Sequence, residues 1–422
     1  MYMEEFVVNS IETGNYSLGL MRIKHCFTRS TNSFFWTLFI VLCVFQDPIK
    51  LVFAPFSYFD ELLAILGLLN LVINYKNLKK QTSQIRVLVL VYLIIGILSS
   101  EINRIQNITV WLSDAFLNIK FFLAIILGAS LTTYIKPRKI AVFLEFVIII
   151  LALLTAISYV SSLFPAGGYR HGIKVLCLFF SHPSTLASAC VTMIGFIFLF
   201  ESDKSKIALF SIILIIMMIL TMRTKAIAAA GVFLFFMMSR RRKSKNKISI
   251  WQIMFAGGLA IIIGWNQFYF YFLENASLAR SALLLTSIQM AKDYFPFGAG
   301  FATFGSHLSA INYSPLYYQY GINNIYGLSP NYPNYISDSF YPMLLGQTGV
   351  FGIIAYICIM IQMFLLFSRK CKNSRYFYAF LLPFIYLIIS GLGESAFVNS
   401  LAIPLAICMG YAYKLSERGY DS

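Results

Sequence analysis

Charged residues are scarce in this sequence, and acidic residues are the scarcest of them. Only 12% of the 422 residues are charged, with 17 Asp and Glu against 33 Lys and Arg. Soluble domains average about 25% charged and ~45 to 50% apolar residues, whereas this chain is 59% apolar and has a mean hydropathy of +0.74. The composition excludes an ordinary soluble domain and predicts an all-α polytopic integral membrane protein.

Other common signals are also missing. The seven cysteines show neither a disulfide framework nor the spacing of a metal site, so no metal is predicted. The first 30 residues lack the apolar core of a cleaved signal peptide, so the first apolar run is expected to direct membrane insertion. The net charge of +16 comes from short clusters on separate loops, which argues against nucleic acid as a partner and for contact with membrane lipids.

Twelve apolar runs approach the roughly 20 residues that a helix needs to cross a bilayer. They cover residues 31–46, 58–75, 85–100, 115–135, 140–163, 184–200, 206–222, 226–239, 250–272, 338–368, 376–392 and 395–413. The predicted organisation is therefore a cytoplasmic segment 1–30, transmembrane helices 1 to 9 in 31–273, a large extracytoplasmic loop 274–337, helices 10 to 12 in 338–413 and a cytoplasmic tail 414–422.

Most Lys and Arg residues lie in seven clusters that alternate with the apolar runs. The clusters are Arg22/Lys24/Arg29, Lys76/Lys79/Lys80/Arg86, Lys136/Arg138/Lys139, Lys204/Lys206, residues 240–247, Arg369/Lys370/Lys372/Arg375 and Lys414/Arg418. Because cytoplasmic loops are enriched in Lys and Arg, the clusters predict the cytoplasmic side. Nine basic residues lie outside them: Lys50, Arg104, Lys120, Arg170, Lys174, Arg223, Lys225, Arg280 and Lys292.

Three of these nine, Arg170, Arg223 and Arg280, are arginines on the predicted outer side. Arg223 joins two short apolar runs and is expected below the membrane surface, where a charged residue is a functional candidate by default. The alternative is a side chain that reaches lipid phosphates at the interface, which is also expected for Lys120. Guanidinium groups bind phosphate oxygens in bidentate fashion and stay charged, so the three arginines predict a site for a pyrophosphate-linked lipid.

The outer segment 274–337 is expected to hold much of the function. Residues 276–294 have the spacing of an amphipathic helix that ends at the Pro and Gly residues of 295–300. A tyrosine-rich stretch follows. Aromatic rings stack on the C–H faces of sugars while their hydroxyl groups form hydrogen bonds. We predict glycan binding by Tyr313, Tyr317, Tyr318, Tyr332 and Tyr335; the alternative is an aromatic belt at the membrane interface.

Three stretches together resemble the bacterial O-antigen and capsule repeat-unit polymerases of the Wzy type and the related O-antigen ligases. They are residues 170–187, residues 220–225, and residues 280–304 continued by 337–352. The third resembles the family's helix ending in Asp, Pro, Gly, any residue, Gly and Phe, followed by a polar pair about a dozen residues before Gly349-Val350-Phe351-Gly352. The ligases have His where this chain has Asp338 and Asn where it has Ser339, a departure that favours a polymerase.

The resemblance implies a GT-C-like glycosyltransferase in the bacterial cytoplasmic (inner) membrane, with its active site facing outside. It would polymerise polyprenyl-pyrophosphate-linked oligosaccharide repeat units into O-antigen, capsule or exopolysaccharide, with inversion and without a metal or cofactor. Arg223 and Arg280, with Arg170 as a third ligand, would bind the pyrophosphate and stabilise its departure. A chain-length regulator and a flippase would be partners. Ligase-type transfer to another acceptor and a lipid-linked oligosaccharide flippase are the alternatives.

The general base that would deprotonate the attacking hydroxyl has several candidates. These are Asp338, His307, His182 and His171. For Asp338 the alternative is an N-cap, since Pro342 would lie in the first turn of the next helix. For His307 it is hydrogen bonding within a loop. Glu394, on the last outer turn, is expected either to orient an arginine or to cap the twelfth span.

Overall fold

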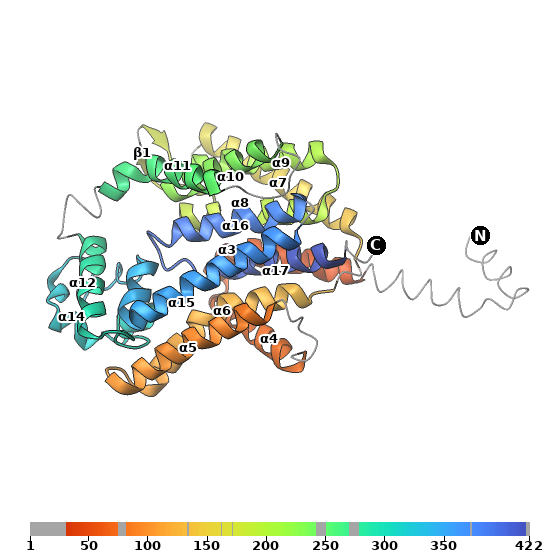
Figure 1. The fold of residues 1–422 in the computed structure, drawn as a ribbon. Coiled ribbons are helices and arrows are strands. Elements are labelled where there is room, and N and C mark those ends of the chain that lie inside the picture. The colour runs from red at the N-terminus through yellow and green to blue at the C-terminus, as the bar shows by residue number, and fades with distance from the viewer. Residues whose placement is uncertain are drawn as a thin grey trace, which may run out of the picture.

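The computed structural model describes residues 31–74, 82–132, 135–161, 163–170, 172–241, 250–269, 278–371 and 374–418. Most of this is helical, which confirms the all-α class (Figure 1). The exception is a small antiparallel hairpin of β1 (Tyr169–Arg170) and β2 (Ile173–Lys174), whose turn contains Gly172 at a φ of +77°. The N-terminal segment 1–30, His171 and residues 419–422 lie outside the described part of the chain.

A helix overlaps each of the twelve apolar runs. The helices are Thr31–Val44, α3 (Gln46–Val52), η1 (Ala54–Tyr58), α4 (Phe59–Ile73), α5 (Ser83–Asn103), α6 (Ile108–Ser130), α7 (Pro137–Val160), α8 (Pro183–Phe200), α9 (Lys204–Leu220), α10 (Thr224–Arg241), α11 (Ile250–Phe268), α12 (Ala279–Asp293), α13 (His307–Ile311), α14 (Pro315–Gln319), η5 (Ile322–Asn324), α15 (Phe340–Lys370), α16 (Ser374–Ser390) and α17 (Ala402–Arg418).

Six of the described helices are long and apolar enough to cross a membrane. They are Ala54–Ile73, α5, α6, α7, α8 and α15, and a seventh span results if Thr31–Val44 and α3, bent by 75°, are counted as one. Within the apolar windows, α8 is 94% buried, whereas α4 and α5 are only 22% buried. Helices that leave this much apolar surface exposed are typical of contact with lipid. Twelve spans remain a prediction.

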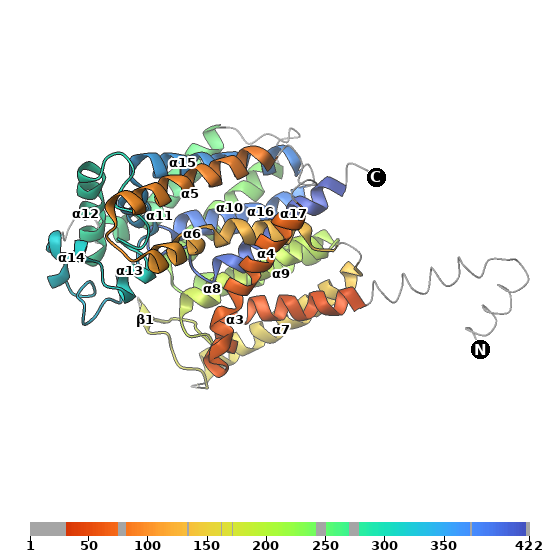
Figure 2. The same ribbon diagram turned by 90° about the horizontal axis from the view of Figure 1, so that it is seen from below.

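Helix α6 lies between α4 and α17, and glycines allow close contact (Figure 2). A Cβ added to Gly67 of α4 would lie 2.2 Å from the carbonyl oxygen of Leu123 in α6, and one added to Gly410 of α17 would lie 2.0 Å from that of Ile125. In lipid, where no hydrophobic force drives helices together, small residues at contacts promote association by close packing.

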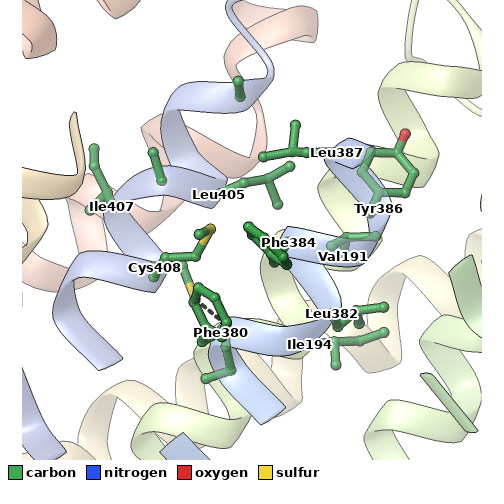
Figure 3. Packing of buried hydrophobic residues seen from close by; sticks show 14 of the residues in the cluster. Val191, Ile194, Phe380, Leu382, Phe384, Tyr386, Leu387, Leu405, Ile407 and Cys408 are labelled. Atoms are coloured by element: carbon green, nitrogen blue, oxygen red, sulfur yellow. Dashed lines mark hydrogen bonds between the residues drawn. The ribbon is translucent and has the colours of Figure 1, made fainter. Parts of the chain in front are cut away.

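A second part of the core joins α8, α16 and α17. Phe380 and Phe384 of α16 stack with ring centroids 5.0 Å apart. Both rings and Cys408 of α17 are buried, and Val191 of α8 is fully enclosed (Figure 3). This packing holds the middle of α16 and of α17 against the middle of α8.

The helices begin and end at two opposite ends of the bundle. At one end Arg138 contacts the Glu201 carboxylate at 2.6 Å, Arg375 donates to the Glu201 carbonyl, and Lys206 contacts Glu145 at 3.0 Å. Three of the seven basic clusters therefore share this end. The first described helix starts and α17 finishes here (Figure 1), and we call it the terminal end. The opposite end carries β1, β2 and residues 278–339, and we call it the loop end.

The two halves of the third sequence motif pack backbone against backbone. Gly298 and Gly349 have φ values of +78° and +63°, and a Cβ on either would lie 2.4 Å from the backbone nitrogen of the other. Ala299 N–H donates to the Gly346 carbonyl at 2.9 Å and Gly300 N–H to that of Gln347 at 2.8 Å. Gly349 is non-helical, so α15 is broken where the loop docks.

A buried carboxylate on α6 holds the same loop. Asp114 accepts hydrogen bonds from the Ala302 N–H at 2.7 Å and from the Gln347 amide at 2.9 Å. The Gln347 amide also donates to the Phe304 carbonyl at 2.9 Å. Buried polar groups need such partners, and these bonds fix residues 295–306 against α6 and α15.

Replacing Gly298 with Ala is expected to destabilise the protein by about 2 to 4 kcal/mol, because the new Cβ meets both a positive φ and the backbone of Gly349. Thermal unfolding in detergent measures the effect. The matched control is Gly257→Ala in α11, where a Cβ meets no atom within 4 Å and alanine favours the helix. Equal melting temperatures of the two variants would contradict the close contact.

Candidate functional site

Basic side chains from separate segments gather at the loop end. Arg170 lies on β1, and its Nη1 donates to the carbonyl of Met222 at 3.2 Å. Met222 has a φ of +50° in the tight turn between α9 and α10, which places Arg223 and Lys225 at the same end. Lys225 interacts electrostatically with both Arg223 and Arg280. The three predicted arginines therefore belong to one cationic cluster, to which Lys225 adds a fourth positive charge.

Arg280, in the first turn of α12, pairs with Asp338. Its Nη2 lies 3.1 Å from Asp338 Oδ2 and 3.3 Å from the carbonyl oxygen of Gly393. The α15 N-cap is Ser339, without a side-chain capping bond, and the Asp338 carboxylate faces Arg280 instead. Burial raises the pKa of Asp338 above its usual range, although Arg280 acts in the opposite direction. A carboxyl group with a raised pKa among cations is a functional candidate.

Lys225 forms an ion pair with Glu394, and both side chains are about four-fifths buried, with 16% and 21% exposed. Glu394 lies on the α16–α17 turn, which the Ser395 N–H anchors to the Ser337 carbonyl at 3.1 Å. The sequence prediction did not assign Lys225 to the site. The available signal was its place outside the basic clusters, two residues after Arg223.

His182 connects the cluster to α8. Its Nδ1 accepts from the Ser184 N–H at 3.2 Å as the N-cap, and its Nε2 lies 2.8 Å from Nη2 of Arg223. Burial, Arg223 and Lys225 lower the pKa of His182 to about 4, so the ring is neutral near pH 7. A neutral imidazole has one acceptor nitrogen, whereas a guanidinium and a backbone N–H can only donate. The single acceptor nitrogen of His182 can therefore serve either the Ser184 N–H or Arg223 at one time.

The other predicted bases lie elsewhere. His307 lies in the first turn of α13 with part of its ring exposed, and partial desolvation together with the positive charges of Lys120 and Lys50 lowers its pKa. It is not among the residues that contact the arginines in the described part of the chain. Lys120 was expected at the interface but is buried, with Nζ 2.5 Å from Asp60 Oδ2 and 3.9 Å from Glu61 Oε1. That expectation was wrong because two acidic residues of α4 compensate the charge.

The predicted glycan-binding tyrosines fall into two groups. Tyr317 is fully buried, with its hydroxyl 2.7 Å from Ser309 Oγ and 2.9 Å from the Gly305 nitrogen, so it has no ring surface for a ligand. Tyr313 is half-buried and donates to the Leu328 carbonyl at 2.6 Å. The rings of Tyr318, Tyr332 and Tyr335 are exposed.

Chemically, the cluster brings the four cations together with the carboxylates of Asp338 and Glu394 and, beside His182, that of Asp47, so positive charge exceeds negative charge by one. Bidentate donors in a cluster with excess positive charge suit a phosphate-bearing ligand. No model of a known protein family matches this sequence, and no curated protein is detectably similar to it. The function is therefore inferred from the residues and their geometry.

Replacing Glu394 with Gln leaves the mostly buried Lys225 charged but without its ion-pair partner. We expect the free energy of unfolding to fall by about 1 to 3 kcal/mol, because breaking a buried ion pair is more costly than breaking an exposed one. The control is the double variant Lys225→Met, Glu394→Gln, which removes both charges. It should be more stable than Glu394→Gln alone in thermal unfolding. If the stability losses of Glu394→Gln and of Lys225→Met alone simply add up in the double variant, the pairing is contradicted.

Proposed function

We propose that this protein polymerises polyprenyl-pyrophosphate-linked oligosaccharide repeat units at the outer face of the bacterial cytoplasmic membrane. The observation that supports this most is the convergence of Arg170, Arg223, Lys225 and Arg280 beside Asp338 at the loop end. A lipid pyrophosphate carries the charge that guanidinium forks bind. Its polyprenyl tail would lie against the apolar helices while its glycan extends over residues 278–339.

The proposal includes twelve spans with the loop end outside. Basic residues of three clusters share the terminal end, and the bias of Lys and Arg toward the cytoplasm assigns that end to the inside. The single arginines of the loop end then lie where this bias disfavours them, as ligand-binding residues would.

Orientation can be tested by cysteine labelling in a variant without native cysteines. Asn331→Cys at the loop end should react with a membrane-impermeant maleimide in intact cells. Ser202→Cys, which is also exposed but lies between α8 and α9 at the terminal end, should react only after permeabilisation. The reverse pattern would overturn the orientation.

The proposed reaction needs no redox partner. A hydroxyl oxygen of one lipid-linked repeat unit attacks the anomeric carbon of a lipid-linked chain, and the bond from that carbon to the pyrophosphate oxygen breaks with inversion. Asp338 takes the hydroxyl proton, and Arg223 and Arg280 stabilise the charge that develops on polyprenyl pyrophosphate. Because Arg280 is paired with Asp338 at 3.1 Å, a pyrophosphate that draws Arg280 away would leave Asp338 as a stronger base.

Arg223→Ala and Arg280→Ala should each abolish long surface polymer while the protein still inserts into the membrane. Lysine at either position should restore little, because a point charge does not reproduce a bidentate fork. The control is Arg104→Ala, whose side chain is 81% exposed near Glu101. Gel analysis of surface glycan measures the effect, and wild-type polymer in Arg223→Ala would remove that residue from the site.

The same experiment separates the proposal from its alternatives. Loss of a polymerase removes only the long chains, so that single repeat units are still attached to their acceptor. Loss of a ligase removes all transfer to the acceptor, and loss of a flippase leaves lipid-linked units on the inner face.

Asp338→Asn keeps the size of the side chain but removes the proton acceptor. Polymerisation should fall at least ~100-fold, within the range for general-base loss, with unchanged expression and melting temperature. Since the base must be deprotonated, wild-type activity should rise with pH through the raised pKa of Asp338, and the residual activity of the variant should lack this rise. Wild-type polymer length in the variant would move the search to His182.

A further inference from the structure

Three exposed tyrosines form one continuous ring cluster at the loop end. The ring centroids of Tyr326 and Tyr332 are 5.0 Å apart and stacked, and Tyr335 lies 5.9 Å from Tyr326 and 6.2 Å from Tyr332. Their exposed fractions are 71%, 39% and 37%. We call Tyr326, Tyr332 and Tyr335 the tyrosine platform. Tyr326 was not among the predicted glycan-binding residues.

The backbone holds the platform in place. Gly327 has a φ of +85°, and a Cβ there would lie 2.0 Å from the ring of Tyr335. The Tyr335 N–H donates to the Gly327 carbonyl at 2.9 Å, and the Tyr332 N–H donates to that of Ser329 at 3.1 Å. The rings are thus presented by a tight, hydrogen-bonded turn, and their arrangement is formed before any ligand arrives.

The platform adjoins the candidate site. The N–H of Asp338 donates to the carbonyl of Tyr335 at 3.2 Å, so the third ring and the carboxylate belong to one turn of chain. Asp338 in turn contacts Arg280. Tyr335 is therefore one turn of chain away from the carboxylate that contacts the cationic cluster.

We propose that the tyrosine platform binds sugar residues of the lipid-linked glycan beside Asp338 and thereby retains the chain between successive additions. This inference rests on the proposed function. Ring faces provide stacking surfaces for the C–H faces of pyranoses, and interacting hydroxyl groups at Tyr326 and Tyr332 provide hydrogen-bonding groups at the same place. Retention near the site raises the effective concentration of the chain end for the next transfer.

Exposed tyrosines can also form an aromatic belt that contacts lipid at the membrane interface. Belt tyrosines flank the ends of transmembrane helices, whereas Tyr326 and Tyr332 lie between η5 and α15 in a segment without a spanning helix. The link from Tyr335 to Asp338 places the rings beside charged groups, which favours a hydrated sugar over lipid.

The test uses full-length protein in nanodiscs and a lipid-free fragment of one to three repeat units, released by mild acid from the surface polysaccharide of the source bacterium. Saturation-transfer NMR and fluorescence titration measure binding. Tyr326→Ala and Tyr332→Ala should each weaken binding roughly 2- to 12-fold, as expected for one aromatic contact. Tyr326→Trp should retain binding, because indole also offers a ring face.

Two controls keep the outcomes separable. Tyr58→Ala removes an exposed ring, 72% accessible, at the end of η1 and outside the platform, and should bind like wild type. Arg280→Ala should lose polymer but keep fragment binding, because the fragment lacks pyrophosphate. In cells, the Tyr326→Ala, Tyr332→Ala variant should make shorter chains.

Unchanged fragment binding and chain length in the Tyr326→Ala, Tyr332→Ala variant, with wild-type melting temperature, would overturn the platform even if the arginine variants behave as proposed. Normal polymer in the arginine variants would overturn the proposed function whatever the platform binds. Reduced membrane insertion of the tyrosine variants with unchanged fragment affinity would identify a membrane belt and likewise reject the platform.

Discussion

The contact between Gly298 and Gly349 is the constraint on which the arrangement of the loop end depends. It joins the loop after α12, the helix that carries Arg280, to the break in α15, the helix that follows Asp338. Neither glycine has room for a side chain, and Asp114 holds the same loop from α6. Backbone contacts of this kind have one register, so the distance between Arg280 and Asp338 is set by packing rather than by the flexible side chains alone.

The charges of the cationic cluster are compensated only in part by the protein. Each cation of the cluster has a partner in the protein. Arg280 contacts the Asp338 carboxylate and Lys225 that of Glu394, whereas Arg223 contacts the neutral ring of His182 and Arg170 a backbone carbonyl. These partners stabilise the folded protein while the cluster as a whole stays positively charged. At the terminal end the pairing is different, because the buried Glu201 carboxylate pairs with Arg138 while the Glu201 backbone carbonyl accepts a hydrogen bond from Arg375.

Local sequence patterns predicted the helices, since a helix overlaps each apolar run, and they singled out the arginines because basic residues are otherwise clustered. They could not predict the pairs, because His182 and Arg223, Arg280 and Asp338, and Lys225 and Glu394 are brought together only by tertiary packing. Local sequence patterns could not predict which side chains are buried either. Tyr317 and Tyr332 look alike in sequence, yet the first is enclosed and the second exposed, and Lys120 is buried by a partner on another helix.

We propose that the cationic cluster and Asp338 join lipid-linked glycans. The most direct test of this proposal is reconstitution of the purified protein in nanodiscs with a lipid-linked repeat unit from the cells that make it, followed by mass spectrometry of the products. The account predicts chains that grow by whole repeat units, with one polyprenyl pyrophosphate released for each new linkage. Intact starting material, or release of pyrophosphate-lipid without chain growth, would contradict it.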